Sequence, residues 1–175
     1  MSDWKRTYWA VWTANFITAT GMMSFLPFFP RHIESLGLSD RAEIELWTGL
    51  VFGAAPLAAA VMTPVWGALG DRIGRKAMIA RAMLAITIFV GGMSYMTTPL
   101  GLFLMRLGQG IFSGFVAPSI TLVSVSAPAD RQGRVTGSLQ TAIALGAVVG
   151  PLLGGVLTPE LGVEVVFRTV ALMAL

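Results

Sequence analysis

Long runs of apolar residues, separated by short polar stretches, make up most of the chain. Five runs have about 20 residues or more, and a sixth reaches Leu175: 7–29, 46–66, 78–97, 100–122, 136–158 and 163–175. About 20 apolar residues in an α-helix cross the roughly 30 Å hydrocarbon core of a bilayer. None of the runs shows the alternation of a membrane barrel strand. The pattern therefore predicts an all-α integral membrane protein with five spanning helices and a truncated sixth.

The composition indicates a lipid environment. Apolar residues make up 55% of the chain and charged residues 12%, and the mean hydropathy is +0.74. These values are far from those of soluble domains. The sequence pI is near 10.0, but the net charge is only +3, and the basic residues lie in short loops, so we expect no nucleic-acid partner. The chain has no cysteine, which excludes disulfides and thiol chemistry, and we expect no metal or cofactor.

The basic residues predict which way the chain crosses the membrane. One side of the predicted bundle would hold Lys5, Arg6, Arg72, Arg75, Lys76, Arg81, Arg131 and Arg134. The other side would hold only Arg31, Arg41 and Arg168, mixed with acidic residues. Cytoplasmic loops carry the excess of Lys and Arg. We therefore expect a multi-pass protein of the cell's inner (plasma) membrane with a cytoplasmic N-terminus.

The polar stretch between the second and third runs concentrates charge around three glycines. Residues 66–76 read WGALGDRIGRK. Its glycines permit a tight reversal, and Asp71 and Arg75 can pair if the turn is helical. A loop of this kind could also be no more than a positive-inside anchor. It is not a phosphate-binding loop, because its glycines are too closely spaced and no Ser or Thr follows Lys76.

The order of residues in this loop resembles the signature G-x-L-x-D-R-x-G-R-K of the major facilitator superfamily. It is matched by Gly67, Leu69, Asp71, Arg72, Gly74, Arg75 and Lys76, while Gly70 replaces the usual alanine. The resemblance implies the N-terminal six-helix bundle of a twelve-helix transporter, with the C-terminal six-helix bundle missing from this chain. It also implies that the loop is a conformational latch between the two bundles.

Three further stretches resemble elements of the same family. RLGQG, from Arg106 to Gly110, is similar to its R-x-x-Q-G element, and GAVVGPLLGG, from Gly146 to Gly155, to the G-x-x-x-G-P-x-x-G-G element of exporters. GMMSFLPFFP at 21–30 is similar to the G-x5-P-x-x-P element of drug:proton antiporters. Together they extend the resemblance over nearly the whole chain, toward bacterial twelve-span multidrug exporters.

Arg106 lies within the fourth apolar run. An arginine at the centre of a membrane helix costs about 2.5 to 3.5 kcal/mol, so it usually faces water or a partner. The alternative is that its long side chain reaches the outer interface. The resemblance implies a role in proton coupling for Arg106, Gln109 and Gly110. No carboxylate lies within runs one to five, so the proton acceptor is missing, peripheral, or in another part of the protein.

Glycines recur every four residues in the fifth run. Gly146, Gly150 and Gly154 therefore share one helix face, beside Pro151 and Gly155. Ordinary packing of small residues explains such a face equally well. Pro151 lacks an N–H and bends a helix. The resemblance implies that this helix seals against a neighbour and limits leakage.

Few polar residues lie within the runs. Asn15 and Thr18 are three apart in the first run and share a face, and Gln109 and Ser113 lie in the fourth. We predict that these residues meet across a substrate cavity, although satisfied hydrogen bonds between helices are an alternative. We expect His32, the single histidine, to be solvated in an outer loop.

These observations predict a transporter rather than an enzyme. The primary hypothesis is proton-coupled efflux of small apolar drugs by alternating access, with the bilayer, a small-molecule substrate and protons as partners. An uptake symporter or facilitator of the same superfamily is the first alternative, because the signature loop does not fix direction. An intramembrane enzyme or sensor is disfavoured, because Ser113 has no histidine in the membrane to act as its base.

Overall fold

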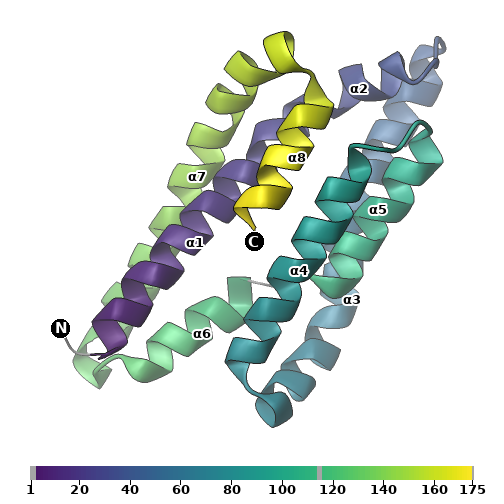
Figure 1. Cartoon of the computed structure of the whole chain (residues 1–175). Coiled ribbons are helices and arrows are strands. Elements are labelled where there is room, and N and C mark those ends of the chain that lie inside the picture. The colour runs from purple at the N-terminus through teal and green to yellow at the C-terminus, as the bar shows by residue number, and fades with distance from the viewer. Residues whose placement is uncertain (1–2, 114–115, 175) are drawn as a thin grey trace.

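A computed structural model describes residues 3–113 and 116–174 as helices joined by short turns (Figure 1). The elements, in chain order, are α1 (Asp3–Phe25), η1 (Leu26–Phe28), α2 (Phe29–Ser35), α3 (Arg41–Ile73), α4 (Arg75–Met93), α5 (Pro99–Phe112), α6 (Val116–Ser126), η2 (Ala129–Arg131), α7 (Gln132–Leu161) and α8 (Val163–Met173). The described residues contain no strand, which confirms the all-helical part of the prediction.

Local sequence explains where several helices begin and end. Asp40 caps α3, because its carboxylate accepts from the Ala42 N–H at 3.2 Å, and Thr98 caps α5 in the same way. These are the residue types preferred at helix N-termini. Gly74 (φ +97°) forms the turn between α3 and α4, and Gly162 (φ +81°) the turn between α7 and α8. Only glycine adopts this backbone conformation at low cost.

The helices follow the apolar runs with two interruptions. α3 contains the run 46–66 and α7 the run 136–158, whereas the first run is broken after Phe25. Pro27, which lacks an N–H, follows this break. The run 100–122 does not form one helix: α5 ends at Phe112 and α6 begins at Val116. Residues 110–115 read GIFSGF, and Gly and Ser are poorer helix formers than Ala or Leu.

Two of the described helices are long and apolar enough to cross a membrane, judged by length and composition alone. They span Arg41–Ile73 and Ala129–Thr158. A shorter apolar helix covers Ala77–Met93. At 1.5 Å per residue, the 33 residues of α3 extend over about 50 Å.

The helices form two pairs that α4 and α8 bring together. α1 packs along α7, and α3 packs along α5 (Figure 1). α4 contacts both α5 and α8, and α8 also contacts α1. α6 diverges from the direction of α5 and packs against α1, α4 and α7.

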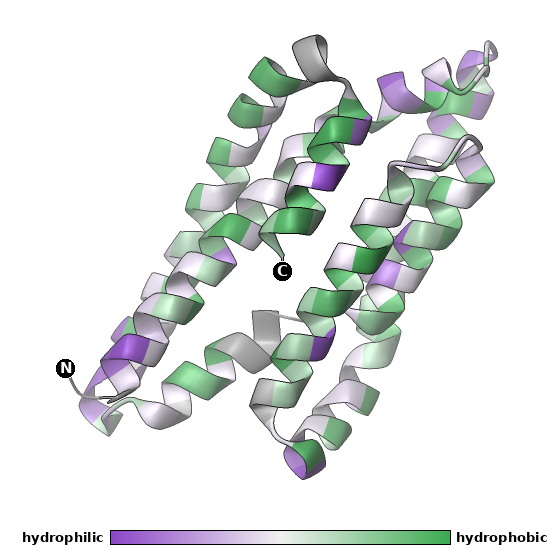
Figure 2. Cartoon of the chain, viewed as in Figure 1, coloured by the Kyte–Doolittle hydropathy of each residue, from purple (hydrophilic) through white to green (hydrophobic). Residues whose placement is uncertain are grey.

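The turns gather at the two ends of the bundle. The N-terminus, the α3–α4 turn and the α6–α7 connection lie at one end, here called the N-terminal end (Figure 1). α2, the α4–α5 connection and the α7–α8 turn lie at the opposite end. Hydrophilic positions concentrate toward both ends, and the stretches between them are mostly apolar (Figure 2).

Two apolar clusters fill the interior. The larger one includes Phe25, Phe29 and Phe167, and the rings of Phe25 and Phe167 lie 5.0 Å apart, edge to face. The smaller one includes Val123 and Leu139. These three phenylalanines of the larger cluster join α1, α2 and α8. Phe29 also lies beside Arg106, the buried polar residue described next.

Candidate functional site

Arg106 on α5 is buried inside the bundle, with 3% of its surface exposed. Its Nε donates to the Val51 carbonyl of α3 at 3.3 Å, and its Nη1 donates to Gln109 Oε1 at 2.8 Å. Gln109 Nε2 in turn donates to Met22 Sδ of α1 at 3.1 Å. The Arg106 guanidinium carbon lies 5.6 Å from the Phe29 ring centroid. The Arg106 side chain therefore does not extend to the surface. It links α5 to α3 directly, and to α1 through Gln109.

The charge of Arg106 is not balanced by an acidic side chain among the described residues. The ion pairs found there are Arg41–Glu45 and Arg131–Asp130, and all four side chains are more than half exposed. Arg106 is solvated instead by a carbonyl, an amide oxygen and an aromatic face. A buried cation in this state strongly attracts any anionic group that approaches, because the surrounding dielectric is low.

Close contact between α3 and α5 places Arg106 within reach of Val51. Gly110 lies directly against α3: an added Cβ would stand 2.8 Å from both Ala55 Cα and Ala58 Cβ. Real Cβ atoms do not approach other atoms so closely. Val51 is one turn before Ala55 on α3, as Arg106 is one turn before Gly110 on α5. The glycine thus sets the separation of the two backbones that the Arg106–Val51 hydrogen bond requires.

Three glycines of α7 bring that helix against the backbone of α1. A Cβ at Gly146 would lie 2.8 Å from the Phe16 carbonyl oxygen, and one at Gly150 would lie 2.6 Å from that of Thr20. A Cβ at Gly154 would overlap the Ser24 carbonyl oxygen. By contrast, Gly155 faces open space.

Pro151, the sixth residue of the exporter-like stretch 146–155, is half-buried and lies inside the continuous helix α7. The structure therefore separates the element into two parts. Gly146, Gly150 and Gly154 make the contact with α1, whereas Gly155 does not take part in it.

The signature loop lies at the N-terminal end and is mostly the last turn of α3. Gly67, Asp71 and Arg72 are exposed there. Gly70 is buried against Met78 of α4, and its carbonyl accepts from the Gly74 N–H at 2.9 Å. The two helices therefore reverse direction within one residue.

Gly74 also separates Asp71 from the basic residues that follow. Arg75 and Lys76 begin α4, and their side chains lie outside the described part of the structure. Because the backbone is not helical at Gly74, Asp71 and Arg75 do not share a continuous helix. The continuous helical turn on which i, i+4 pairing depends is therefore interrupted at Gly74.

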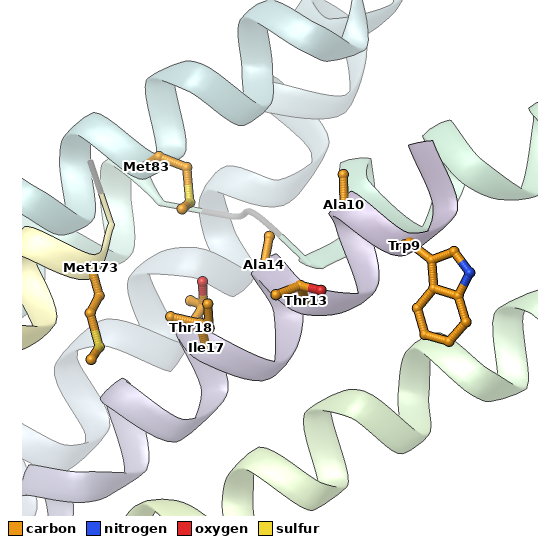
Figure 3. Close-up of a pocket in the computed structure, with 8 residues that line it drawn as sticks. All are labelled: Trp9, Ala10, Thr13, Ala14, Ile17, Thr18, Met83 and Met173. Carbon is orange, nitrogen blue, oxygen red and sulfur yellow. The ribbon is translucent and has the colours of Figure 1, made fainter. Parts of the chain in front are cut away.

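A pocket of about 510 Å³ lies between α1, α4 and α8 (Figure 3). It is lined by Trp9, Ala10, Thr13, Ala14, Ile17, Thr18, Met83 and Met173. Thr18 is the one predicted cavity residue in this lining. Asn15 is buried with 1% of its surface exposed, Gln109 belongs to the Arg106 network, and Ser113 follows the end of α5. Gln109 reaches α1 through Met22.

Sequence reasoning missed the partnership of Trp66 and Arg81, here called the Trp66–Arg81 clamp. The Arg81 guanidinium carbon lies 3.5 Å from the Trp66 ring centroid, and Arg81 Nη2 donates to the Ser113 carbonyl at 2.7 Å. Trp66 Nε1 donates to the Ile111 carbonyl at 2.6 Å. Carbonyls at a helix end have no partner within the helix. The poor helix formers in GIFSGF were the signal that carbonyls would need partners here.

The prediction of a solvated His32 was wrong. His32 is buried, with 5% of its surface exposed, and its ring packs edge-on against Phe167 at 5.8 Å. It lies on α2, whose buried residues are Phe29, His32 and Ile33. The spacing i, i+3, i+4 is that of a helix with one buried face. The segment after Pro27 is therefore helical and covers the end of the bundle.

The fold and the site define an all-helical bundle that holds a buried cation between three of its helices. No group of three or more His, Asp or Glu side chains that could hold a metal is found in the part of the chain that the structure describes. The family model of the Major Facilitator Superfamily matches residues 11–175. The chain belongs to this superfamily, as the signature loop indicated.

Individual relatives cover nearly the whole chain. The chain is 37% identical over 172 residues to the Staphyloferrin B transporter of Staphylococcus aureus (strain NCTC 8325 / PS 47), covering 98% of this chain and 41% of the relative. It is 37% identical over 174 residues to the multi-drug resistance efflux pump PmrA homolog of Lactococcus lactis subsp. lactis (strain IL1403). This match covers 99% of this chain and 43% of the relative. It is 34% identical over 166 residues to the multidrug resistance protein MdtG of Proteus mirabilis (strain HI4320). This match covers 95% of this chain and 41% of the relative. The chain therefore spans less than half the length of these curated relatives.

Proposed function

We propose that the chain is the N-terminal six-helix half of a twelve-helix transporter. In this proposal the whole protein exports small, largely apolar compounds across the plasma membrane by alternating access and couples export to protons. Two kinds of relative support export, since PmrA and MdtG proteins carry multidrug efflux or resistance in their names. One observation carries the proposal. Arg106 of α5 is buried against α3 and α1, and no acidic side chain among the described residues pairs with it.

The outer surface supports a bilayer as the surroundings of this half. Large apolar side chains are exposed along the helices, among them Leu57, Val61, Ile88, Val148 and Leu152. Soluble monomers rarely expose contiguous apolar surface on this scale. The basic residues at the N-terminal end favour a cytoplasmic position for that end.

Arg106 is suited to control proton movement. Its buried positive charge repels protons and attracts carboxylates. A carboxylate brought near it by the C-terminal half would be held ionised, and would take up a proton when the two separate. Gln109 and Gly110 would support this role, Gln109 by fixing the guanidinium and Gly110 by setting its distance from α3.

The pocket in Figure 3 is suited to a small apolar substrate. Its lining combines aliphatic groups with Trp9, Thr13 and Thr18 and with two methionines, Met83 and Met173. Methionine side chains are flexible and polarizable, and adapt to ligands of different shape. In the whole transporter this surface would form one wall of the cavity, and the C-terminal half would supply the other.

The signature loop would act as a latch at the cytoplasmic end. Asp71 and Arg72 are exposed, and neither forms an ion pair within the described residues. Their charges remain available to a second bundle. In our proposal they engage it when the cytoplasmic end is closed and release it when that end opens, while the glycines of α7 keep α1 and α7 sealed together.

An accumulation assay on the full-length protein tests both direction and latch. Cells that lack their own efflux pumps should accumulate less of a fluorescent apolar dye when they express the protein. Higher accumulation would establish uptake instead, and unchanged accumulation would argue against transport of such compounds. The variant Asp71→Asn should raise accumulation to the level of cells without the protein, although it inserts normally.

Asp130→Asn is the matched control for this variant, because Asp130 is also an exposed aspartate in a turn at the same end. It should keep wild-type efflux. Equal amounts of each variant in the membrane fraction would exclude an insertion defect. Wild-type efflux by the Asp71→Asn protein would refute the latch.

A further inference from the structure

A small cavity at the end of the bundle opposite the N-terminus contains the buried His32. Its volume is about 230 Å³. α2 contributes Arg31, His32 and Ser35, α7 contributes Thr158, and α8 contributes Glu164 at its first turn. A water molecule occupies about 30 Å³ of liquid volume, so the cavity has room for several. It is separate from the pocket in Figure 3 and from the Arg106 network.

Two polar atoms beside this cavity are buried and have no hydrogen-bond partner among the residues that the structure describes. They are His32 Nε2 and Thr158 Oγ1. Buried polar groups in folded proteins almost always have a partner, and an exception calls for an explanation. Both residues line the same cavity, so a water or a proton held there would satisfy both. This is the observation that points to a ligand.

The charges around His32 are few and come from both sides of the cavity. Arg31 is its neighbour on α2, and Glu164 faces the cavity from α8. Glu34 on α2 and Arg41, Glu43 and Glu45 on α3 are exposed and do not line it, while the side chain of Glu160 on α7 lies outside the described residues. Burial lowers the pKa of His32 from its ordinary 6.5, and Glu164 acts in the opposite direction.

We propose that His32 is a proton-binding site of this half of the protein, with Glu164 as its counter-ion and Thr158 as its hydrogen-bond acceptor. A proton from water in the cavity adds to the lone pair of Nε2 and converts the neutral ring to an imidazolium. The new N–H donates to Thr158 Oγ1, directly or through a water, and the Glu164 carboxylate balances the charge.

The position of the site gives it a place in transport, and this part rests on the proposed function. α2 lies at the end that we place outside the cytoplasm, where protons enter during proton-driven export. The first five apolar runs contain no carboxylate to accept a proton, and His32 offers an acceptor beside them. Protonation would also draw α2 and α8 together, because it creates an attraction between His32 and Glu164 that the neutral ring lacks.

The single histidine of the chain permits a direct test. The 175-residue protein is labelled with ¹⁵N-histidine, placed in lipid nanodiscs and titrated by NMR between about pH 4 and 8. His32 should titrate below its ordinary 6.5, and Glu164→Gln should lower its pKa further, because the carboxylate that favours the imidazolium is gone. Glu45→Gln is the matched control, because Glu45 is an exposed glutamate on α3 that does not line the cavity. It should leave the titration of His32 unchanged.

A titration at the ordinary value that Glu164→Gln does not alter would overturn the proposal and identify a solvated side chain. The amide spectrum of each variant shows whether the helices are intact. If Glu164→Gln does not fold, Thr158→Val provides the second test, since removal of the acceptor should also lower the His32 pKa. The NMR result does not depend on transport: failed dye export with the expected titration would remove the proposed function and leave the site.

The same site predicts how stability depends on pH. The folded pKa of His32 lies below the unfolded value, so the unfolded chain binds the proton more readily. The contribution of His32 to stability is therefore complete above the unfolded value and is lost as the pH falls through it toward the folded pKa. Thermal unfolding at pH 7.5 and pH 5 should show this loss in the wild type and a smaller one in His32→Gln.

Discussion

The two closest helix pairs of this chain are built differently. α1 and α7 meet through Gly146, Gly150 and Gly154, which lie against the carbonyls of α1. One polar contact between them, from Tyr8 to Ser138 at 2.5 Å, lies near the N-terminal end. α3 and α5 meet through a single such glycine, Gly110, and are joined by side chains that donate to backbone carbonyls across the interface.

We expect this difference to separate stability from function. Three glycines in register leave no room for a side chain between α1 and α7, so that pair can only remain packed. Small residues at such contacts permit close approach in membranes, where van der Waals contact drives association. The α3–α5 pair instead holds Arg106 and the Trp66–Arg81 clamp. We expect damage to the first pair to unfold the chain, and damage to the second to impair the proposed transport first.

The largest effect should come from a side chain placed between α1 and α7. In Gly150→Leu the Cβ alone would lie 2.6 Å from the Thr20 carbonyl oxygen, and backbone atoms cannot move aside as a flexible side chain does. Overpacking a tight core costs about 1 to 3 kcal/mol and occasionally more, and we expect the upper end of this range. Thermal or denaturant unfolding in detergent measures the loss.

Gly155→Leu is the matched control, because position 155 lies in the same helix and faces open space. It should change stability by less than about 0.5 kcal/mol, or increase it slightly through better helix propensity. Equal losses from the two substitutions would show that α7 is intolerant of leucine as such. The comparison between the two pairs would then fail.

Arg106→Met should have the opposite profile. It removes a buried charge, which is often neutral or favourable for stability, and leaves Gln109 Oε1 without its donor, which costs about 1 to 3 kcal/mol. These effects offset each other, so the unfolding free energy should change by about 1 kcal/mol or less. Efflux by the full-length protein should fall at least tenfold, equivalent to about 1.4 kcal/mol in activation free energy.

Arg106→Lys refines this prediction. Lysine keeps the charge and loses the planar fork that donates to both Val51 and Gln109, so it should restore part of the efflux. Full efflux from the methionine variant would show that Arg106 is a structural residue. Loss of folding in the methionine variant would show that the α3–α5 pair, like α1–α7, serves stability.

The sequence predicted the features that depend on composition and spacing. Run length and hydropathy were enough for α3 and α7, which contain their predicted runs, and the four-residue spacing of Gly146, Gly150 and Gly154 was enough for a shared face. The neighbour of that face, α1, could not be predicted, because spacing within one helix says nothing of the helix it meets.

Features that depend on tertiary contact were missed. His32 was placed in a solvated loop, because Pro27 and Pro30 obscured the short helix that buries it. The break after Phe112 was hidden within a continuous apolar run, since hydropathy does not record helix propensity. In the sequence, Arg81 counted only as one of the basic residues that predict the orientation in the membrane. Its partner, the Ser113 carbonyl, is a free acceptor only because α5 ends before it, and that helix end was not predicted.

The smallest effect should follow from opening the Trp66–Arg81 clamp. Arg81→Gln removes the hydrogen bond to Ser113 and the contact over Trp66, each worth about 0.5 to 1.5 kcal/mol. It also removes Arg81 Nε and Nη1, which are buried and have no partner within the described part of the chain, so the net loss should be about 1 kcal/mol. Hydrogen exchange should quicken at the Ser113 amide, which donates to the Gln109 carbonyl at the end of α5.

The control Arg72→Gln changes an exposed arginine at the same end of the bundle and should leave exchange at Ser113 unaltered. Arg81→Lys separates the two contributions, because lysine keeps the charge over the indole ring and shortens the reach to the carbonyl. If Arg81→Gln exchanges at the wild-type rate, the carbonyls at the end of α5 are satisfied without the clamp. Within the described residues, the contrast with α1–α7 would then rest on two hydrogen bonds of the α3–α5 pair, from Arg106 to Val51 and from Trp66 to Ile111.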